Sequence, residues 1–360
     1  MVKIVDGSVG EGGGQVLRYA ISTSALLGED LRIYNIRAKR RPPGLRPQHI
    51  TAIKAVAEVC GGTVEGLRIG SSSIVFKPSK PRAGRYFFDT GTAGSVSLVL
   101  QSLLPVLCFA DGPCEVEISG GTNNPLAPPV DYIQEVLIPA LRRMGVHVEV
   151  TLVKRGFYPR GHGLVRVRSE PVKQLQPIKA LDAEVRQIEV YAYSCNLPDH
   201  IVRRMAGTAE TLLRKAGYTD ILVRTEALGQ QDPKNALDPG TGILILARLS
   251  NGLSMGFDAL GERGVPAEEV ARRTIDEALH QLSTGAPIDK HLADQLIIWM
   301  ALASGESTIR TSTLTSHTST GIEVVGSLTG AKFTVSELRG FGVKIGCQGV
   351  GFSFRLLSNS

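Results

Sequence analysis

The chain has 360 residues, of which 42% are hydrophobic, and its 40 basic and 34 acidic residues give a net charge of +6. This length and composition exclude a disordered chain and a single small domain, and they favour a turn-rich α/β protein with two domains or a set of repeats. The pI near 9.1 is compatible with a phosphate-bearing partner, although a charge of this size does not identify a nucleic-acid-binding protein.

Five cysteines are scattered along the chain, and none forms a CxxC pair. This usage predicts reduced thiols and argues against a disulfide scaffold or a zinc knuckle. The chain does not open with a basic segment and an apolar core, and its longest apolar stretch, around 95–110, contains Ser97 and Gln101. We therefore expect a cytoplasmic protein with no signal peptide and no membrane partner.

The first predicted elements are a short apolar strand, a glycine-rich turn over 6–14 and a helix. Glycines let the backbone approach a polar ligand closely, and the helix start offers unpaired N–H groups to an anion. Glu11, Gln15 and Arg18 are spaced so that they could gather around this turn. The spacing matches neither the Walker pattern nor the dinucleotide fingerprint, and a tight connection without a ligand is the alternative.

A strand predicted at 31–36 leads into the most basic segment of the chain, and Gln48 and His49 then open the next helix. The basic segment holds five cations, Arg37, Lys39, Arg40, Arg41 and Arg46. Its prolines keep it extended, so that it could present a row of donors to phosphate oxygens. A solvated charged loop is the other interpretation.

Three further segments carry candidate ligand contacts. An apolar helix predicted over 95–107 is interrupted by Gln101. A strand at 116–119 opens into a loop rich in Gly, Asn and Pro over 120–129, which precedes a long helix. Rigid loops at strand ends are where α/β proteins bind ligands. The turn at 155–163 is aromatic and basic, and it could offer a stacking face and phosphate donors.

The sequence pattern changes near Val185, and we predict a smaller inserted α/β domain over 185–283. Residues 1–184 and 284–360 then form a larger domain. Four segments share a pattern in which a helix ends at glycine and an alternating strand follows, and these glycines are Gly61, Gly145, Gly217 and Gly330. The pattern predicts a repeated α/β module, although any α/β protein contains some helix–glycine–strand units.

His317 is the strongest candidate for chemistry near the end of the chain. It follows a strand predicted at 309–315 and precedes Ser and Thr residues and a helix expected from Gly321. The positive end of that helix would disfavour the imidazolium and keep the ring neutral and nucleophilic near pH 7. A structural histidine is the alternative. The last strands are predicted at 332–335 and 352–356.

These motifs occur in one order along the chain: GEGGGQVLR (10–18), RPPGLRPQH (41–49), SGGTNNPLAPP (119–129), RGFYPRGHG (155–163), LGERGVPAEE (260–269), LADQL (292–296) and the His317 segment. Together they resemble the RNA 3'-terminal phosphate cyclase family almost from end to end. The resemblance implies an α/β (α+β) fold with a large domain of three βαβαββ repeats and a small α/β insert. The repeats would be similar to those of enolpyruvyl transferases and of the C-terminal domain of translation initiation factor three.

The resemblance also implies an ATP-dependent reaction at RNA 3'-phosphate ends, with Mg²⁺ or Mn²⁺ as the metal. His317 would take AMP from ATP as a histidyl-AMP, and the AMP would then pass to the RNA 3'-phosphate. The neighbouring 2'-OH would close a 2',3'-cyclic phosphodiester and release AMP. Such a protein should recognise the RNA end and its phosphates more than its sequence.

Matched position by position, the resemblance gives roles to three groups of residues. The resemblance implies that His317, Glu11 and Arg18 are catalytic and that Glu11 also holds the metal. It implies substrate contacts for Arg37, Arg40, Gln48 and His49. Nucleotide contacts fall on Gln101, Pro128, Tyr158, His291, Leu292, Ala293, Asp294 and Gln295. His291 departs from the family pattern, which often has Tyr there, so we expect a smaller stacking area.

Two other classes of protein remain as alternatives. A cyclase-like ribosome-biogenesis factor would bind RNA without the reaction, and such proteins lack the nucleophilic histidine context. An enolpyruvyl-type transferase would share the architecture without needing a histidine nucleophile. The sequence leaves open the physiological RNA, the preferred metal, the role of the insert and whether the protein is a homo-oligomer.

Overall fold

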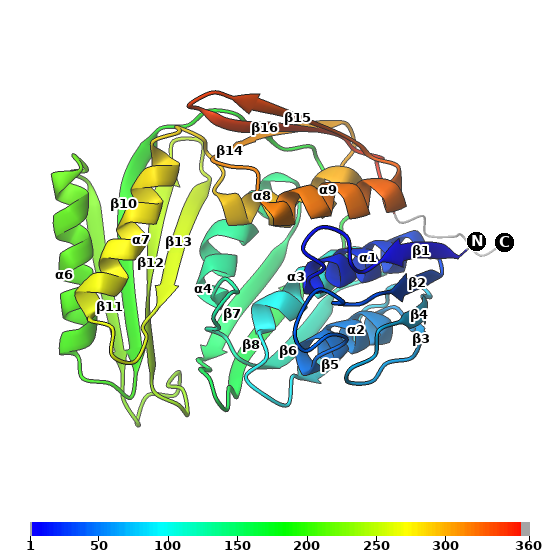
Figure 1. The fold of residues 1–360 in the computed structure, drawn as a ribbon, viewed down its shortest axis with the longest axis horizontal. Coiled ribbons are helices and arrows are strands. Elements are labelled where there is room, and N and C mark those ends of the chain that lie inside the picture. Colours follow the sequence, from blue (N-terminus) through cyan, green and yellow to red (C-terminus); the bar gives the residue numbers. More distant parts are fainter. Residues whose placement is uncertain (1, 354–360) are drawn as a thin grey trace.

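The computed structural model describes residues 2–353, which form a larger body and an insert that lies at the left of Figure 1 with α6 and α7. The larger body contains three copies of one βαβαββ module. The first copy is β1 (Lys3–Asp6), α1 (Gly14–Leu27), β2 (Leu31–Tyr34), α2 (Pro47–Val59), β3 (Thr63–Glu65) and β4 (Ile74–Lys77).

The second and third copies repeat this order of elements. The second is β5 (Gly84–Asp89), α3 (Val96–Cys108), β6 (Cys114–Gly120), a helix made of α4 (Val130–Tyr132), the π-helical η1 (Ile133–Leu137) and α5 (Ile138–Arg143), then β7 (Val148–Lys154) and β8 (Gly163–Ser169). The third is β9 (Lys179–Ala180), α8 (Lys290–Leu302), β14 (Glu306–Thr311), α9 (Ser316–Thr329), β15 (Lys332–Leu338) and β16 (Gly342–Gln348).

Each module forms its own four-stranded sheet with the same strand order, β1-β2-β4-β3, β5-β6-β8-β7 and β9-β14-β16-β15. The first two strands of each sheet are parallel, and the first helix of the module supplies the crossover that a parallel pair requires. The other neighbours are antiparallel. The three βαβαββ repeats expected from the sequence are therefore confirmed.

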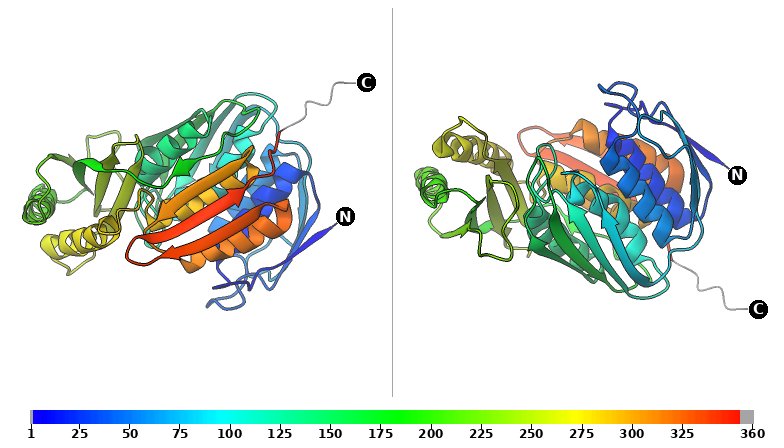
Figure 2. Two further views of the ribbon diagram at one scale, coloured as in Figure 1. Left: turned by 90° about the horizontal axis from the view of Figure 1, so that it is seen from above. Right: turned by 90° about the horizontal axis from the view of Figure 1, so that it is seen from below.

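The helices pack between the three sheets, which lie on the outside of the body (Figure 1, Figure 2). α1 contacts α2, α3 and α9, and α9 also contacts α8. α1, α3 and α8 are buried on nearly every side. Their sequences are apolar around most of the helix, as the interior of a layered protein requires.

The insert enters the third module between β9 and α8. It consists of β10 (Val185–Cys195), α6 (His200–Lys215), β11 (Ile221–Leu228), β12 (Gly240–Leu249), β13 (Ser254–Leu260) and α7 (Ala267–Leu282). Its sheet has the order β11-β10-β12-β13, and α6 and α7 pack against each other. These elements all fall within the predicted range 185–283.

A buried arginine joins the insert to the body. Arg155, which follows β7, is fully buried and donates two hydrogen bonds to Asp131 at 2.9 and 2.8 Å. The same guanidinium donates to Glu226 on β11 at 2.8 Å and to the hydroxyl of Tyr191 on β10 at 2.8 Å. It also lies 4.1 Å from the centre of the Tyr193 ring. One cation therefore satisfies carboxylates from both parts of the molecule.

Two expectations about elements are wrong. Gly61, Gly145 and Gly330 each follow the second helix of a module, with φ of 59°, 84° and 79°. Gly217 instead lies in the insert, whose order of elements differs, so the four segments are not four copies of one unit. The closing strand of the third sheet is β16, whereas Phe352 and Ser353 are not in a strand and positions 354–356 lie outside the described residues.

Two simpler expectations can be compared with the structure. All five cysteines are free and buried, as reduced thiols would be. Within residues 2–353, no helix has the length and apolarity needed to cross a membrane.

Candidate active site

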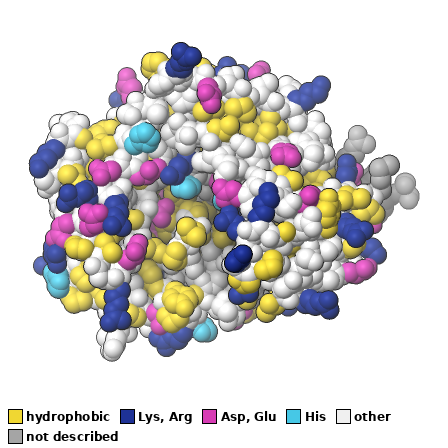
Figure 3. All heavy atoms as spheres, viewed as in Figure 1, with side chains coloured by type: hydrophobic (Ala, Val, Ile, Leu, Met, Phe, Trp, Pro, Cys, Tyr) yellow, Lys and Arg dark blue, Asp and Glu magenta, His cyan; other side chains and the backbone are white. Residues whose placement is uncertain are grey.

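A cleft of about 1110 Å³ lies between the body and the insert, and Figure 3 shows a hollow at this place. The start of every module helix borders it. The lining residues at or just before these starts are Gly14 for α1, His49 for α2, Ser97 for α3, Pro128 for α4, His291 for α8 and His317 for α9. Five of these helices follow the carboxyl end of a strand that belongs to a parallel pair, and α8 follows the insert. Their N–H groups and dipoles favour an anion in the cleft.

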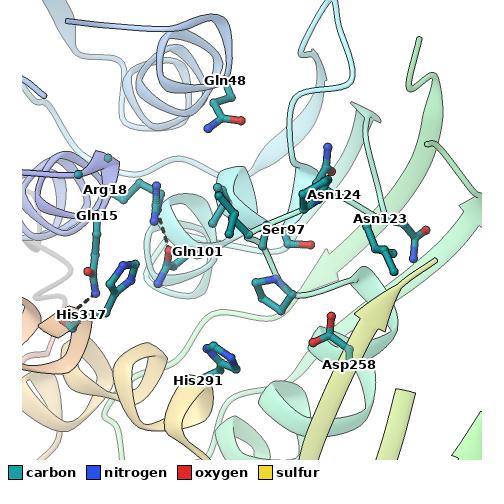
Figure 4. A pocket seen from close by; sticks show the side chains of 18 of the residues that line it. Gln15, Arg18, Gln48, Ser97, Gln101, Asn123, Asn124, Asp258, His291 and His317 are labelled. Atoms are coloured by element: carbon teal, nitrogen blue, oxygen red, sulfur yellow. Dashed lines mark hydrogen bonds between the residues drawn. The ribbon is translucent and has the colours of Figure 1, made fainter. Parts of the chain in front are cut away.

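His317 lies within the first turn of α9, and not ahead of the helix as expected. The Thr315 hydroxyl accepts a hydrogen bond from the Thr318 N–H at 3.0 Å, so the helix begins at Ser316. The Gln15 amide donates to the carbonyl of His317 at 2.9 Å and ties the start of α9 to α1 (Figure 4). The imidazole is nevertheless half-exposed in the cleft.

Two carboxyl groups flank the His317 imidazole. Its Nε2 lies 3.7 Å from Oε2 of Glu11, and its Nδ1 lies 3.8 Å from Oδ2 of Asp294. Burial lowers the pKa of His317, and Arg18 and Arg40 lower it further, whereas Glu11 opposes the shift. The ring is therefore uncharged near neutrality and has a free electron pair, as a nucleophile requires.

Asp294 differs from an ordinary surface carboxylate. Burial raises its pKa to about 8, Asp289 raises it further, and Arg18 opposes the shift. The carboxyl group consequently holds a proton for much of the time near pH 7. In this form it can donate a hydrogen bond as well as accept one.

Glu11 is ionised and already held in place. The Ser316 hydroxyl donates to its Oε1, and Arg40 donates to its Oε2 at 2.6 Å. The Ser316 hydrogen bond is the main cause that lowers the pKa of Glu11, and His317 and Arg40 act in the same direction. Residues 2–353 contain no cluster of three or more His, Cys, Asp or Glu that could hold a metal. The Glu11 carboxylate, which lines the cleft, still fits Mg²⁺, because this ion binds through one or two protein carboxylates and completes its coordination with other oxygen ligands.

Arg18 is buried in α1, and its Nε donates to Oε1 of Gln101 at 2.7 Å (Figure 4). Burial lowers its pKa to about 10, so the guanidinium is still a cation near neutrality. The hydrogen bond to Gln101 fixes the plane of the guanidinium. Its other N–H groups are thereby oriented before any ligand binds.

His49 is buried beside the glycine-rich turn. Its Nδ1 accepts a hydrogen bond from the Arg46 N–H at 3.1 Å, which places the proton of the neutral ring on Nε2. Burial and the nearby Arg18 and Arg37 lower its pKa to about 3. A Cβ at Gly14 would lie 2.3 Å from Nε2, so glycine is needed here to admit the imidazole. At Gly14, the glycine-rich turn therefore makes room for the His49 side chain of the protein itself.

Arg37 uses part of its guanidinium to hold its own loop. Its Nη1 donates to the carbonyls of Pro42 and Gly44 at 2.9 and 3.0 Å. Its φ of 53° is unusual for a residue with a side chain, and these two hydrogen bonds offset that conformation. Arg37 also lines the cleft.

The structure brings most of the residues expected at the site into this one cleft: Glu11, Arg18, Arg37, Arg40, Gln48, His49, Gln101, Pro128, Tyr158, His291, Asp294, Gln295 and His317. Leu292 and Ala293 do not line it, because both are fully buried in the core. The helical period explains this difference. His291, Asp294 and Gln295 share one face of α8, and the two residues between them face the opposite side.

Sequence reasoning missed several lining residues, including Asn123, Asn124, Lys290 and Asp258. The two asparagines lie in the Gly/Asn/Pro loop that was singled out, and Lys290 directly precedes a predicted contact. Asp258 lies within strand β13 of the insert. No motif marks it, and only the packing of the insert against the body brings it to the cleft.

Fold and site together define a three-module α/β protein whose anion-binding cleft holds an uncharged histidine. A family model described as RNA 3'-terminal phosphate cyclase matches residues 9–335. The chain belongs to this family.

Several similar proteins carry the same name. RNA 3'-terminal phosphate cyclase of Hyperthermus butylicus is 45% identical over 329 residues, which is 90% of this chain and 91% of the relative. The protein of that name from Desulfurococcus amylolyticus is 43% identical over 97% of this chain and 98% of its own length. Among solved structures, the enolpyruvyl transferase NikO from Streptomyces tendae aligns with 99% of this chain and 83% of its own, at 11% identity and a TM-score of 0.27.

Proposed function

We propose that the protein converts RNA 3'-terminal phosphates to 2',3'-cyclic phosphodiesters, using ATP and a covalent histidyl-AMP intermediate. The observation that carries this proposal is the uncharged His317 imidazole, which lies between Glu11 and Asp294 in a cleft bordered by six helix starts. Family membership supports the overall reaction.

In the first step, an imidazole nitrogen of His317 attacks the α-phosphorus of ATP. An N–P bond forms, the bond from phosphorus to the leaving oxygen breaks, and pyrophosphate departs. The ring becomes positively charged as it reacts, the ionised Glu11 near one nitrogen can stabilise that charge, and an oxygen of Asp294 near the other nitrogen can accept a hydrogen bond. No separate base is required, because the attacking nitrogen carries no proton in the neutral ring.

The phosphates would be held by charges that are already oriented. Arg18 is fixed by Gln101, and the helix starts present backbone N–H groups. Glu11 would hold a divalent metal, Mg²⁺ or Mn²⁺, whose charge neutralises the phosphate oxygens when it is bound. Such preorganised charges stabilise the transition state of phosphoryl transfer without rearrangement.

In the later steps, an oxygen of the RNA 3'-phosphate attacks the phosphorus of histidyl-AMP and releases His317. The neighbouring 2'-OH then attacks the activated 3'-phosphate, a P–O bond closes the cyclic diester, and AMP leaves. Arg37, Arg40, Gln48 and His49 line the body side of the cleft and are available to hold the RNA end. They present charge and hydrogen-bond donors without a surface for reading sequence.

The test is self-adenylylation with α-labelled ATP and Mg²⁺ or Mn²⁺. We expect acid-labile label on the wild-type protein and none on His317→Ala. His147→Ala is the matched control, because His147 is an exposed histidine that does not line the cleft, and it should retain the label. An unlabelled wild-type protein that still binds RNA would favour a non-catalytic, RNA-binding ribosome-biogenesis factor.

A further inference from the structure

The cleft has two chemically different ends. Arg18, Arg40 and His49 lie on the body side, where the helix starts meet. On the insert side the lining includes Leu260 and Gly261 together with the acidic residues Asp258 and Glu262, and it is not cationic. A nucleotide whose phosphates lie at the cationic end must therefore direct its base toward the insert.

Asp258 is the acidic side chain that strand β13 of the insert places in this wall (Figure 4). A Cβ at Gly256 would meet the Tyr132 ring of the body at 2.6 Å, so that face of β13 is turned toward the body. Asp258 is two residues further along and shares the same face. Its side chain therefore points away from the outer surface of the insert.

The strand that carries Asp258 is held firmly against helix α8. The buried carboxylate of Asp289 accepts from the Gly256 N–H at 3.1 Å through Oδ2. Its Oδ1 accepts from the N–H groups of His291 and Leu292, each at 2.9 Å. One carboxylate thus fixes β13 beside the start of α8. Asp258 on the strand and His291 on the helix therefore line the same cleft from two elements that are held together.

The carboxyl group of Asp258 has no hydrogen bond and no ion pair with any side chain or backbone group in residues 2–353. The side chain is half-buried and lines the cleft, so its carboxyl oxygens are available to a ligand. Burial raises its pKa to about 7, with Asp289 and Asp131 adding to the shift and Lys290 opposing it. The protonated and the ionised carboxyl group each keep an oxygen that can accept a hydrogen bond.

We propose that Asp258 accepts a hydrogen bond from the exocyclic amino group of the nucleobase, so that the insert selects a 6-aminopurine triphosphate. This inference rests on the proposed function, because it takes the cleft to be the nucleotide site. It gives the insert a direct part in substrate choice. Pro128 and His291 line the cleft near this wall and are available to contact the faces of the base.

The test compares ATP with purine riboside triphosphate, which lacks only the amino group. Dissociation constants are measured by calorimetry in the His317→Ala background, where no adduct can form. We expect ATP to bind about five- to tenfold more tightly than the analogue, the effect of one hydrogen bond. Asp258→Ala should bring this ratio close to one by weakening ATP alone.

Two further variants separate the hydrogen bond from other effects. Asp258→Asn keeps an accepting oxygen and should retain most of the preference for ATP. Asp276→Ala removes an exposed acid on α7 that does not line the cleft, and it should leave the ratio unchanged. The inference is overturned if Asp258→Ala weakens both nucleotides equally, or if the parent does not distinguish them. If the parent binds neither nucleotide and the wild type forms no adduct, the proposed function itself fails.

Discussion

At the scale of single residues, the site depends on keeping one imidazole uncharged among several charges. Arg40 contributes in two ways, because it lies near His317 and also pairs with Glu11 at 2.6 Å. Its positive charge lowers the pKa of the imidazole directly. Its pairing with Glu11 also neutralises the carboxylate that acts in the opposite direction.

Arg40→Gln should therefore raise the pKa of His317. In the proposed reaction the neutral ring is the reactive form, so the acid limb of the pH profile for the first step should move upward by roughly 0.5–1 pH unit. The measurement is kcat/KM for pyrophosphate release as a function of pH. Arg41→Gln removes an exposed cation that does not line the cleft and should leave the limb in place. An unmoved limb in Arg40→Gln would contradict this assignment.

At the same scale, the sequence predicts residue types better than it predicts contacts. The Gly/Asn/Pro loop, the basic segment and His317 were all identified from local pattern and family resemblance. Asp258 was missed because no motif surrounds it, and a single acid in a strand resembles a solvated side chain. Leu292 and Ala293 were included because a contiguous motif was taken as a unit, whereas in a helix only residues three or four positions apart share one face, so these two turn into the core.

At the scale of elements, the start of α8 is fixed by one buried side chain, that of Asp289. Asp289 is fully buried and accepts from two N–H groups of the helix, from the Tyr132 hydroxyl at 2.7 Å and from Gly256 on β13. It therefore caps a helix and joins two parts of the fold. Most caps perform only the first of these tasks.

Asp289→Ala should lower the free energy of unfolding by about 2–4 kcal/mol, because several buried donors lose their acceptor. Chemical denaturation measures this change. Asp199→Ala is a matched control, since Asp199 occupies the N-cap of α6 but its side chain caps no N–H. We expect it to change stability by less than about 1 kcal/mol. Equal losses in the two variants would show that the buried network of Asp289 is unimportant.

Helix boundaries show where sequence reasoning reaches its limit. The expected start of α9 was late because Thr315, Ser316, Thr318, Ser319 and Thr320 are all good N-cap residues. The hydrogen bond that decides among them is visible only in three dimensions. Strand β9 has two residues, too few for any periodicity to reveal it.

At the scale of the whole molecule, the insert and the body are locked together by Arg155. The cation is fully buried, so removing it leaves Asp131 and Glu226 without their main partner. Arg155→Gln should lower the free energy of unfolding by about 3–5 kcal/mol. Arg166→Gln breaks an exposed pair with Glu117 and should cost less than about 1 kcal/mol. If denaturation curves of the two variants coincide, the buried network does not stabilise the junction.

The position of the insert also imposes an order on folding. β9 pairs with β14 through Lys179 with Thr308 and Ala180 with Ile309, so it must wait until the whole insert and α8 have been synthesised. The first two modules can complete their sheets as they leave the ribosome, because their partners are close in sequence. Glu11 and Ser316, which meet in the cleft, are 305 residues apart. The cleft that holds His317 is consequently the last part of the molecule to assemble, and a nascent chain that stops before the third module lacks the histidine that the proposed reaction needs.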